Sequence, residues 1–202
     1  MEFFVYGRGR PGSEALAEEL AEAHWSYMDD YAEVMIARGP TLTPDRSSWT
    51  GSLHLVELPD TQAAQVFAFQ EPFYQAGVYD EVLVRRWHNT LGATMWDYPA
   101  ALGDDQRFLV IGHAKPGAEA ARQALETAQR HWVDTPGHRA GCILCGPLLT
   151  EEGTGWQGSV LLVQLADRAA VEAMVASAPY VQAGLYGSLE LHDWQFGGRH
   201  QD

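Results

Sequence analysis

A histidine in the first half of this chain stands where an acid–base residue could work. His24 lies four residues after Leu20 and three before Tyr27, at the edge of an apolar helical stripe. A free imidazole titrates at about pH 6.5, so this side chain could act as a general base or acid. We predict His24 as a catalytic residue. The alternative is a histidine at the edge of the core that bonds to a backbone carbonyl.

A carboxylate beside His24 would fix the tautomer of the imidazole and stabilise its protonated form. Asp45, in the polar loop that follows the first Gly-Pro pair, is the first choice for this catalytic partner. Glu71 is another candidate, which we place with the substrate-binding residues. The corresponding loop of the second half offers Glu151 and Glu152. For each of these acids the alternative is a solvated charge on a loop.

The chain repeats its own sequence. From residue 39 to residue 87 the first half matches residues 146–194 without a gap, at a shift of 107 positions. Repeat units of solenoid proteins span roughly 20–50 residues, so a repeat of this length indicates a duplicated domain. The matching landmarks are Gly39-Pro40 with Gly146-Pro147, Trp49 with Trp156, Pro72–Tyr79 with Pro179–Tyr186, and Trp87 with Trp194.

The same shift places the pair His24-Trp25 on His131-Trp132. The opening apolar strand recurs at a shift of 105, so we expect a two-residue change between that strand and the middle of the first helix. His131 is therefore the predicted catalytic residue of the second half. Trp25 and Trp132 could stack on an aromatic substrate, although packing at the rim of the core is the alternative.

Each half reads as strand, helix, strand, strand, helix, strand. The first helix is expected to begin at Ser13-Glu14 and to carry its apolar stripe as far as Met35. Asp60 and Asp167 are N-cap candidates for the second helix of each half. The predicted class is α+β, with two ferredoxin-like βαββαβ repeats.

An antiparallel sheet with both helices on one face leaves its other apolar face uncovered. The equivalent sheet of the other half would cover that face. We therefore expect the two sheets to pack face to face as an intrachain α+β barrel, a pseudo-dimer. The expected domains are residues 1–90 and 107–197, joined by a linker over 91–106. Strand edges at the rim leave room for a further homodimer.

The composition excludes several function classes. A net charge of −14 argues against nucleic acid and against anionic membrane surfaces as partners. No apolar run reaches transmembrane length and no signal peptide is visible, so we expect a cytoplasmic protein. No His-x-x-x-His or Glu-x-x-His spacing occurs, and we predict neither a metal nor a cofactor.

The only cysteines, Cys142 and Cys145, lie in an apolar run that reads as a strand. A redox Cys-x-x-Cys pair works at the N-terminus of a helix, where the thiolate is stabilised. Residues three apart on a regular strand face opposite sides, so the two sulfurs should not meet. We expect buried thiols.

These motifs together resemble the YCII-related (YciI-like) family. Members carry a histidine on the first helix, a Gly-Pro pair after it, a Gly-Ser strand and a closing Pro-[Phe/Tyr]-x-x-Ala-Gly-[Val/Leu]-Tyr segment. In this chain they are Gly39-Pro40, Gly51-Ser52 and Pro72–Tyr79, and all three recur in the second half. The resemblance implies the dimeric α+β barrel fold, usually built from two chains and here fused in one.

The resemblance also implies cofactor-free acid–base chemistry around a His–Asp pair, as in dehydrochlorination of a chlorinated hydroxyquinol. We therefore expect an enzyme of lyase or isomerase type that performs elimination, isomerisation or dehydration on an aromatic or cyclic small molecule. One alternative is a cofactor-independent monooxygenase of phenolic substrates, which the same superfamily contains. Another is a barrel that binds a small molecule without reacting with it, because a fold alone does not define a reaction.

Overall fold

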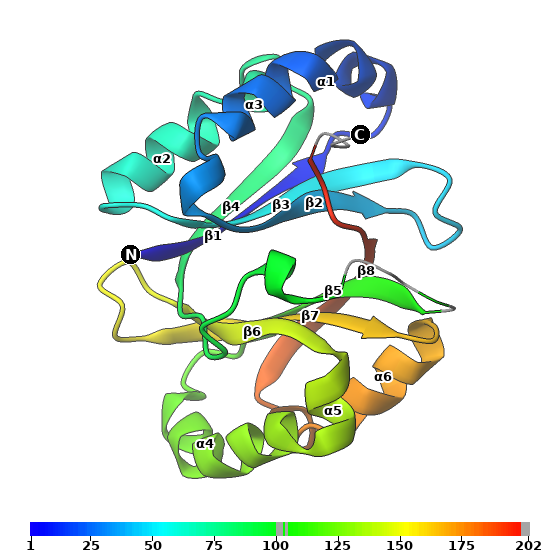
Figure 1. The fold of residues 1–202 in the computed structure, drawn as a ribbon. Helices are drawn as coiled ribbons and strands as arrows, with labels where there is room; N and C mark the ends of the chain where they lie inside the picture. Colours follow the sequence, from blue (N-terminus) through cyan, green and yellow to red (C-terminus); the bar gives the residue numbers. More distant parts are fainter. Residues whose placement is uncertain (100–102, 104, 199–202) are drawn as a thin grey trace. The chain divides into compact units, whose positions relative to one another are not determined.

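A computed structural model describes residues 1–99, 103 and 105–198. The chain divides into two compact units, one formed by Met1–Trp87 with the segment that begins at Asp193, the other by His88–His192. Each unit is an antiparallel sheet with helices on one face, as Figure 1 shows. The predicted α+β class and the two βαββαβ repeats are confirmed. The packing of one sheet on the other stays a prediction.

The predicted domain boundaries 1–90 and 107–197 also stay a prediction. The 3₁₀ helix η2 (Met95–Asp97) lies in the expected linker 91–106. Positions 100–102 and 104 of that linker lie outside the described residues.

The sheet of the first unit has the strand order β4-β1-β3-β2. Its strands are β1 (Glu2–Gly9), β2 (Met35–Leu42), β3 (Trp49–Glu57) and β4 (Tyr79–Trp87). The helices are α1 (Glu14–Asp29), α2 (Thr61–Phe69) and α3 (Pro72–Gln75), with a 3₁₀ helix η1 (Ala32–Val34). Phe3, Val5 and Val56 of the sheet pack against Met28 and Phe67 of the helices in one hydrophobic cluster. Alternate residues of β1 therefore face the helices.

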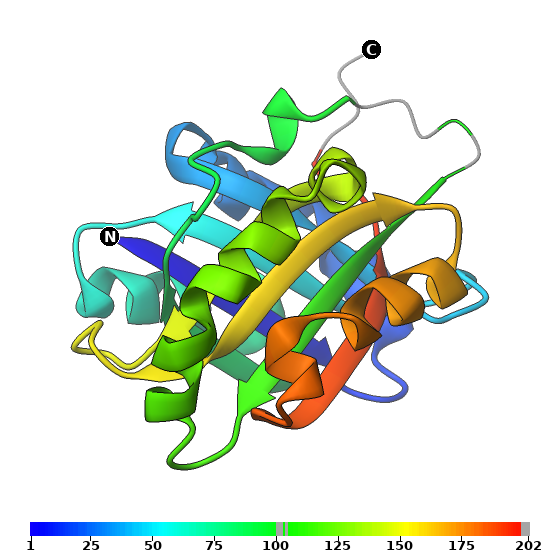
Figure 2. The same cartoon turned by 90° about the horizontal axis from the view of Figure 1, so that it is seen from below.

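The sheet of the second unit has the strand order β8-β5-β7-β6. Its strands are β5 (Gln106–Ala114), β6 (Cys142–Leu149), β7 (Trp156–Leu165) and β8 (Tyr186–Trp194), of which the last two residues belong to the first unit. The helices are α4 (Glu119–Asp134), α5 (Pro136–Gly141), α6 (Arg168–Ala176) and α7 (Pro179–Gln182). Figure 2 shows α4 and α6 lying across this sheet. Phe108 and Val110 face them.

Helix starts follow the sequence closely. The carboxylates of Asp60 and Asp167 accept hydrogen bonds from the backbone N–H groups of Ala63 and Ala170, each at 2.8 Å, so both predicted N-caps are confirmed. The first long helix ends earlier than predicted. Helix α1 stops at Asp29, and Met35 begins a strand.

The first helices of the two repeats correspond at a shift of 105, because α1 runs from Glu14 to Asp29 and α4 from Glu119 to Asp134. The strands that follow begin 107 positions apart. The two extra residues therefore lie after the helix, where α5 replaces the shorter η1. The prediction of a change before the middle of the helix is wrong. The structural counterpart of His24 is consequently Gln129 rather than His131.

At each of the recurring Gly-Pro pairs, the backbone of another segment of the same unit forms hydrogen bonds with the strand. In the first unit the N–H of Gln195 donates to the carbonyl of Pro40, and that of Gly197 to the carbonyl of Arg38. A side chain on Gly39 would place its Cβ 2.0 Å from the carbonyl oxygen of Gln195, so only glycine allows this approach. In the second unit the N–H of His88 donates to the carbonyl of Pro147 in the same way.

Cys142 and Cys145 are free and buried on β6, as predicted. Their expected separation on opposite sides is wrong, because the register of β6 shifts between Cys142 and Leu144 and this irregularity breaks the strand alternation. The Cys145 thiol and burial together raise the pKa of Cys142 well above its usual value, so that thiol stays protonated at neutral pH.

Candidate active site

A pocket of about 260 Å³ lies in the first unit, between helix α1 and the helix-covered face of the sheet. Its walls combine apolar, aromatic and titratable side chains. They include Ala17, His24, Trp25 and Met28 from α1, Arg38 to Pro40 from β2, Trp49, Ser52 and His54 from β3, and Phe73 from α3. Small-molecule sites are mostly apolar with a few polar groups, and the walls of this pocket have such a composition.

His24, in the wall of this pocket, forms a buried pair with Glu71, which lies behind it. The imidazole Nδ1 lies 2.9 Å from Glu71 Oε2, and only 7% of His24 and 3% of Glu71 are exposed. With Glu71 ionised, its carboxylate can only accept, so Nδ1 carries the hydrogen and Nε2 carries a lone pair. Among the described residues no hydrogen bond engages that Nε2. In this tautomer the Nε2 atom of His24 can accept a proton.

Two further contacts hold the pair in place. Glu71 caps α3, and its Oε1 accepts a hydrogen bond of 2.9 Å from the backbone N–H of Tyr74. The His24 ring stacks on Phe73, with 4.2 Å between ring centroids and 12° between planes. Pro72, which follows Glu71, favours the start of α3 and so fixes the carboxylate behind the imidazole. Glu71 itself does not line the pocket.

A second histidine lies beside the pair. The ring centroid of His54, on β3, is 5.6 Å from that of His24, and His54 is only 4% exposed. Burial lowers the pKa of His54 well below 6.5, and the nearby His24 and Arg38 lower it further. His54 is therefore neutral in the folded protein at neutral pH.

Tyr79 adds a second neutral group near the pair. Burial raises the pKa of its phenol well above 10, and the charge of Glu71 adds to that rise. The phenol therefore keeps its proton. Arg38 is the cation of the pocket, and its Nη1 donates to Asp29 Oδ1 at 3.2 Å.

The structure places Asp45 in its own loop and not beside His24. Asp45 Oδ1 accepts hydrogen bonds from the hydroxyls of Thr43 and Ser47 at 2.5 Å and 2.8 Å, and from the Ser47 N–H at 3.1 Å. The hydrogen bond from the Thr43 hydroxyl lowers the pKa of Asp45 below its usual value, and the hydrogen bonds from Ser47 lower it further. Glu71, the other candidate from the sequence, is the carboxylate bonded to His24.

The remaining predicted residues divide between the two units. Trp25 lines the first pocket and is 41% exposed. His131 is exposed on α4 and does not line the pocket of its unit. Trp132 does line that pocket, and its indole N–H donates to Ser177 Oγ at 2.9 Å. The structure therefore brings His24, Glu71 and Trp25 to one site, and it leaves His131 outside.

Sequence analysis missed His54, Arg38 and Phe73. His54 and Ser52 lie two apart on a strand, so they share the face that β3 turns to the helices. A histidine in an otherwise apolar strand was the available indication. The second repeat has Leu161 at the corresponding position and Ala178 in place of Glu71.

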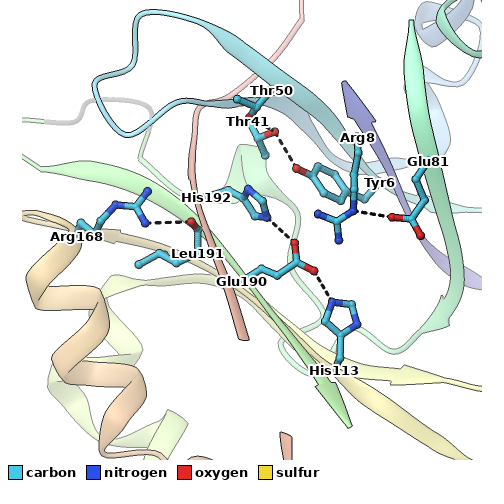
Figure 3. A network of polar contacts seen from close by, with 10 residues as sticks. All are labelled: Tyr6, Arg8, Thr41, Thr50, Glu81, His113, Arg168, Glu190, Leu191 and His192. Carbon is cyan, nitrogen blue, oxygen red and sulfur yellow. Dashed lines mark hydrogen bonds and ion pairs between the residues drawn. The ribbon is translucent and has the colours of Figure 1, made fainter. Parts of the chain in front are cut away.

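A different polar cluster lies on the helix-free face of the second sheet. His113 Nε2 is 2.5 Å from Glu190 Oε1, and His192 Nε2 is 3.0 Å from Glu190 Oε2. Figure 3 shows both imidazoles directed at this carboxylate. Within the described residues no group of histidine, cysteine, aspartate or glutamate side chains has the arrangement of a metal site.

The first sheet also carries polar contacts on its helix-free face. The phenol of Tyr6 and the hydroxyl of Thr41 lie 3.1 Å apart, and Arg8 Nε donates to Glu81 Oε2 at 2.8 Å (Figure 3). Because Val5 faces the helices, Tyr6 and Arg8 face the opposite way. None of these side chains lines the pocket with His24.

The repeated α+β units, each with a pocket between helix and sheet, define a duplicated ferredoxin-like protein. The YCII-related domain matches residues 1–88 and again residues 91–195. The chain therefore belongs to the YCII-related family and contains its domain twice. A search of curated proteins finds no match. No helix in the described part of the chain is both long and apolar enough to cross a membrane.

Solved structures with similar folds include several enzymes. The 5-chloro-2-hydroxyhydroquinone dehydrochlorinase of Burkholderia phenoliruptrix AC1100, solved with 2,5-dihydroxybenzoquinone, is 28% identical over 46% of this chain and 99% of its own, with a TM-score of 0.43. An anthrone oxidase-like protein is 14% identical over 97% of this chain and 90% of its own, with a TM-score of 0.54.

A mutant chlorite dismutase of Candidatus Nitrospira defluvii is 8% identical over 96% of this chain and 90% of its own, with a TM-score of 0.58. At these identities the anthrone oxidase-like protein and the chlorite dismutase show that the fold is shared, and the fold alone.

Proposed function

We propose that the first unit is an enzyme site in which His24 transfers a proton to or from a small aromatic or cyclic substrate. The observation that carries this proposal is the 2.9 Å contact between His24 Nδ1 and Glu71 Oε2, which leaves Nε2 for the pocket. Glu71 orients the imidazole and stabilises its protonated form, as the third group of a catalytic triad does. His54 and Tyr79, both neutral, leave His24 as the base.

The pocket favours a planar substrate. Trp25, Trp49 and Phe73 supply aromatic walls, and Arg38 supplies a positive charge for an oxygen that becomes negative in the reaction. Removal of a proton beside a carbonyl or a phenol leads to elimination, isomerisation or dehydration. Each of these reactions needs an acid–base residue, and none needs a cofactor or an electron acceptor.

Hydrogen–deuterium exchange tests this proposal without the natural substrate. The protein is incubated in D₂O with cyclohexane-1,3-dione, chlorohydroquinone and a small lactone, and loss of C–H signals is followed by NMR. We expect the wild type to accelerate exchange or chloride release for at least one compound. His24→Gln should reduce that rate by about 10²–10⁴-fold, the usual contribution of a general base.

Oxygen dependence separates this function from the monooxygenase alternative. A monooxygenase would consume the phenol only in air, whereas proton transfer proceeds equally under argon. No acceleration by the wild type, although a ligand binds, would instead indicate a binding protein. An accelerated rate that is unchanged in His24→Gln would exclude His24 as the base, and either result would overturn the proposal.

A further inference from the structure

The second unit contains a larger pocket that lacks counterparts of His24, Glu71 and His54, although His88, Glu126 and Asp134 are among its lining residues. Its volume is about 490 Å³, against about 260 Å³ in the first unit, and ligand pockets span roughly 300–1,000 Å³. At the positions of His24, Glu71 and His54 the second repeat has Gln129, Ala178 and Leu161. No proton can be moved by these three side chains.

The cavity is larger because α4 lies over its sheet with fewer side chains inside. Helix α1 buries Ala17, His24 and Met28, whereas none of the residues of α4 is buried. Gln129 lines the pocket, and its Oε1 accepts a hydrogen bond of 3.2 Å from the N–H of Tyr180 on α7. Gln129 therefore connects α4 to α7 by a hydrogen bond, as His24 connects α1 to Glu71 at the start of α3.

Aromatic side chains line the enlarged cavity. The Trp156 ring lies 5.5 Å from Tyr180 and 5.6 Å from Tyr186, centroid to centroid. Trp156 and Tyr180 are 8% and 5% exposed. Trp132 and Leu161 also line the cavity. These surfaces match a planar, apolar ring.

Two hydrogen-bond donors in this lining have no partner among the described residues. They are the indole Nε1 of Trp156 and the Nε of Arg122. In the first unit the equivalent indole of Trp49 donates to Ser52 Oγ at 3.4 Å. In the second unit the phenol of Tyr186 donates to Ser159 Oγ instead, at 3.0 Å, so this serine is engaged by the tyrosine. Buried donors without acceptors are uncommon, because each costs free energy.

The charge around Arg122 is already balanced in part. Its Nη1 lies 3.5 Å from Glu119 Oε1 and its Nη2 lies 3.4 Å from Glu126 Oε1. Nε is the nitrogen that remains for another acceptor. A ligand therefore needs an oxygen that accepts hydrogen bonds, but it does not need a full negative charge.

We propose that this pocket binds an aromatic molecule with an acceptor oxygen, which Trp156 and Arg122 hold by hydrogen bonds, without the His24–Glu71 pair of the first unit. The duplicated chain would then join one reactive site to one binding site. Binding in the second unit is independent of His24, so it can be tested whether or not the first unit is an enzyme.

The indole N–H resonances of the tryptophans report on the two pockets separately. Trp49→Phe and Trp156→Phe identify the resonance of each pocket in ¹H–¹⁵N spectra. Acetophenone, benzoate and ethylbenzene are then added in turn. We expect acetophenone or benzoate to move the Trp156 indole proton downfield with saturation, and whichever of the two binds more tightly identifies a carbonyl or a carboxylate as the acceptor. Ethylbenzene, which has the ring but no oxygen, should bind at least about tenfold more weakly.

Variants complete the test. Arg122→Met replaces the unbranched stem of the arginine by one of similar length and removes the guanidinium donors, and it should weaken binding by about tenfold. Trp156→Phe should weaken it as well, followed through the indole resonance of Trp132, which lines the same cavity. His24→Gln should leave the affinity of the second pocket unchanged. Equal affinity for ethylbenzene and acetophenone, or no response of the Trp156 resonance to any compound, would overturn the proposal.

Discussion

The Nδ1 atom of His24 and the Oε2 atom of Glu71 lie 2.9 Å apart although 47 residues separate them in the chain. Helix α1 carries the histidine, and the start of the short helix α3 carries the carboxylate. The second repeat keeps both helices but has neither residue at the corresponding positions. The pair is therefore not required by the fold, and its presence in one repeat calls for a function there.

Replacement of His24 should destabilise the protein more than replacement of His131. His24→Ala leaves the buried carboxylate of Glu71 without its imidazole partner, which costs about 1–3 kcal/mol in the free energy of unfolding. His131 is exposed, so His131→Ala should change that free energy by less than about 0.5 kcal/mol. Urea unfolding of both variants measures the difference. Equal effects of the two substitutions would contradict the helix register in which Gln129, and not His131, is the counterpart of His24.

Glu71→Gln tests which of the two carboxylates predicted from the sequence, Glu71 or Asp45, is the partner of His24. The amide has the shape of the acid but cannot stabilise the protonated imidazole by charge. We expect the exchange rate of the proposed reaction to fall at least about tenfold, with little change in affinity for the substrate.

Asp45→Asn is the matched control for this charge removal. Because Asp45 accepts its hydrogen bonds from Thr43 and Ser47 in its own loop, the exchange rate should stay within about twofold of the wild type. A larger loss in Asp45→Asn than in Glu71→Gln would show that the loop closes on His24 during the reaction and that the first choice from the sequence was right.

His54 should make the first unit sensitive to acid. Its pKa lies well below 6.5 in the folded protein, mainly through burial, whereas the unfolded chain takes up a proton at about pH 6.5. Stability is therefore complete above that pH and falls as the pH drops below it, by at most about 1.4 kcal/mol per pH unit.

His54→Leu introduces the residue that the second repeat has at this position, and it removes the imidazole that takes up a proton when the chain unfolds. The decline in unfolding free energy between pH 6.5 and pH 5 should then be shallower than in the wild type. The comparison needs urea unfolding of both proteins at several pH values in this range. An unchanged slope would mean that His54 is not the buried neutral imidazole seen here.

Gly39 should tolerate no side chain. The new Cβ of Gly39→Ala would lie 2.0 Å from the carbonyl oxygen of Gln195, so one of the two segments must move, at a cost of about 1–3 kcal/mol. Gly137→Ala is a suitable control, since nothing lies within 4 Å of the corresponding Cβ. Thermal unfolding of both variants measures the cost. A stable Gly39→Ala protein would show that the segment after Trp194 is not held against β2.

Much of the fold could be predicted because the repeat supplied each element twice. The N-caps Asp60 and Asp167 and the strands that begin at Trp49 and Trp156 follow from local sequence alone. The end of α1 could not be predicted, since apolar residues continue at helical spacing beyond Asp29.

The site was harder to predict than the fold because it depends on small shifts of backbone. Only two residues, inserted after α4, decide whether Gln129 or His131 takes the place of His24. The irregularity in β6 similarly brings together two cysteines that a regular strand would place on opposite sides. Glu71 faces His24 because Pro72 begins α3 directly after it, which the spacing of acids along the sequence does not reveal.

The tautomer of His24 tests the central claim most directly, through long-range ¹H–¹⁵N NMR of the imidazole nitrogens at neutral pH. We predict a hydrogen on Nδ1, a bare Nε2 that responds to bound phenols or cyclic ketones, and loss of the fixed tautomer in Glu71→Ala. A hydrogen on Nε2, with neither nitrogen responding to any ligand, would contradict a general base at this position and leave the pair as a structural contact.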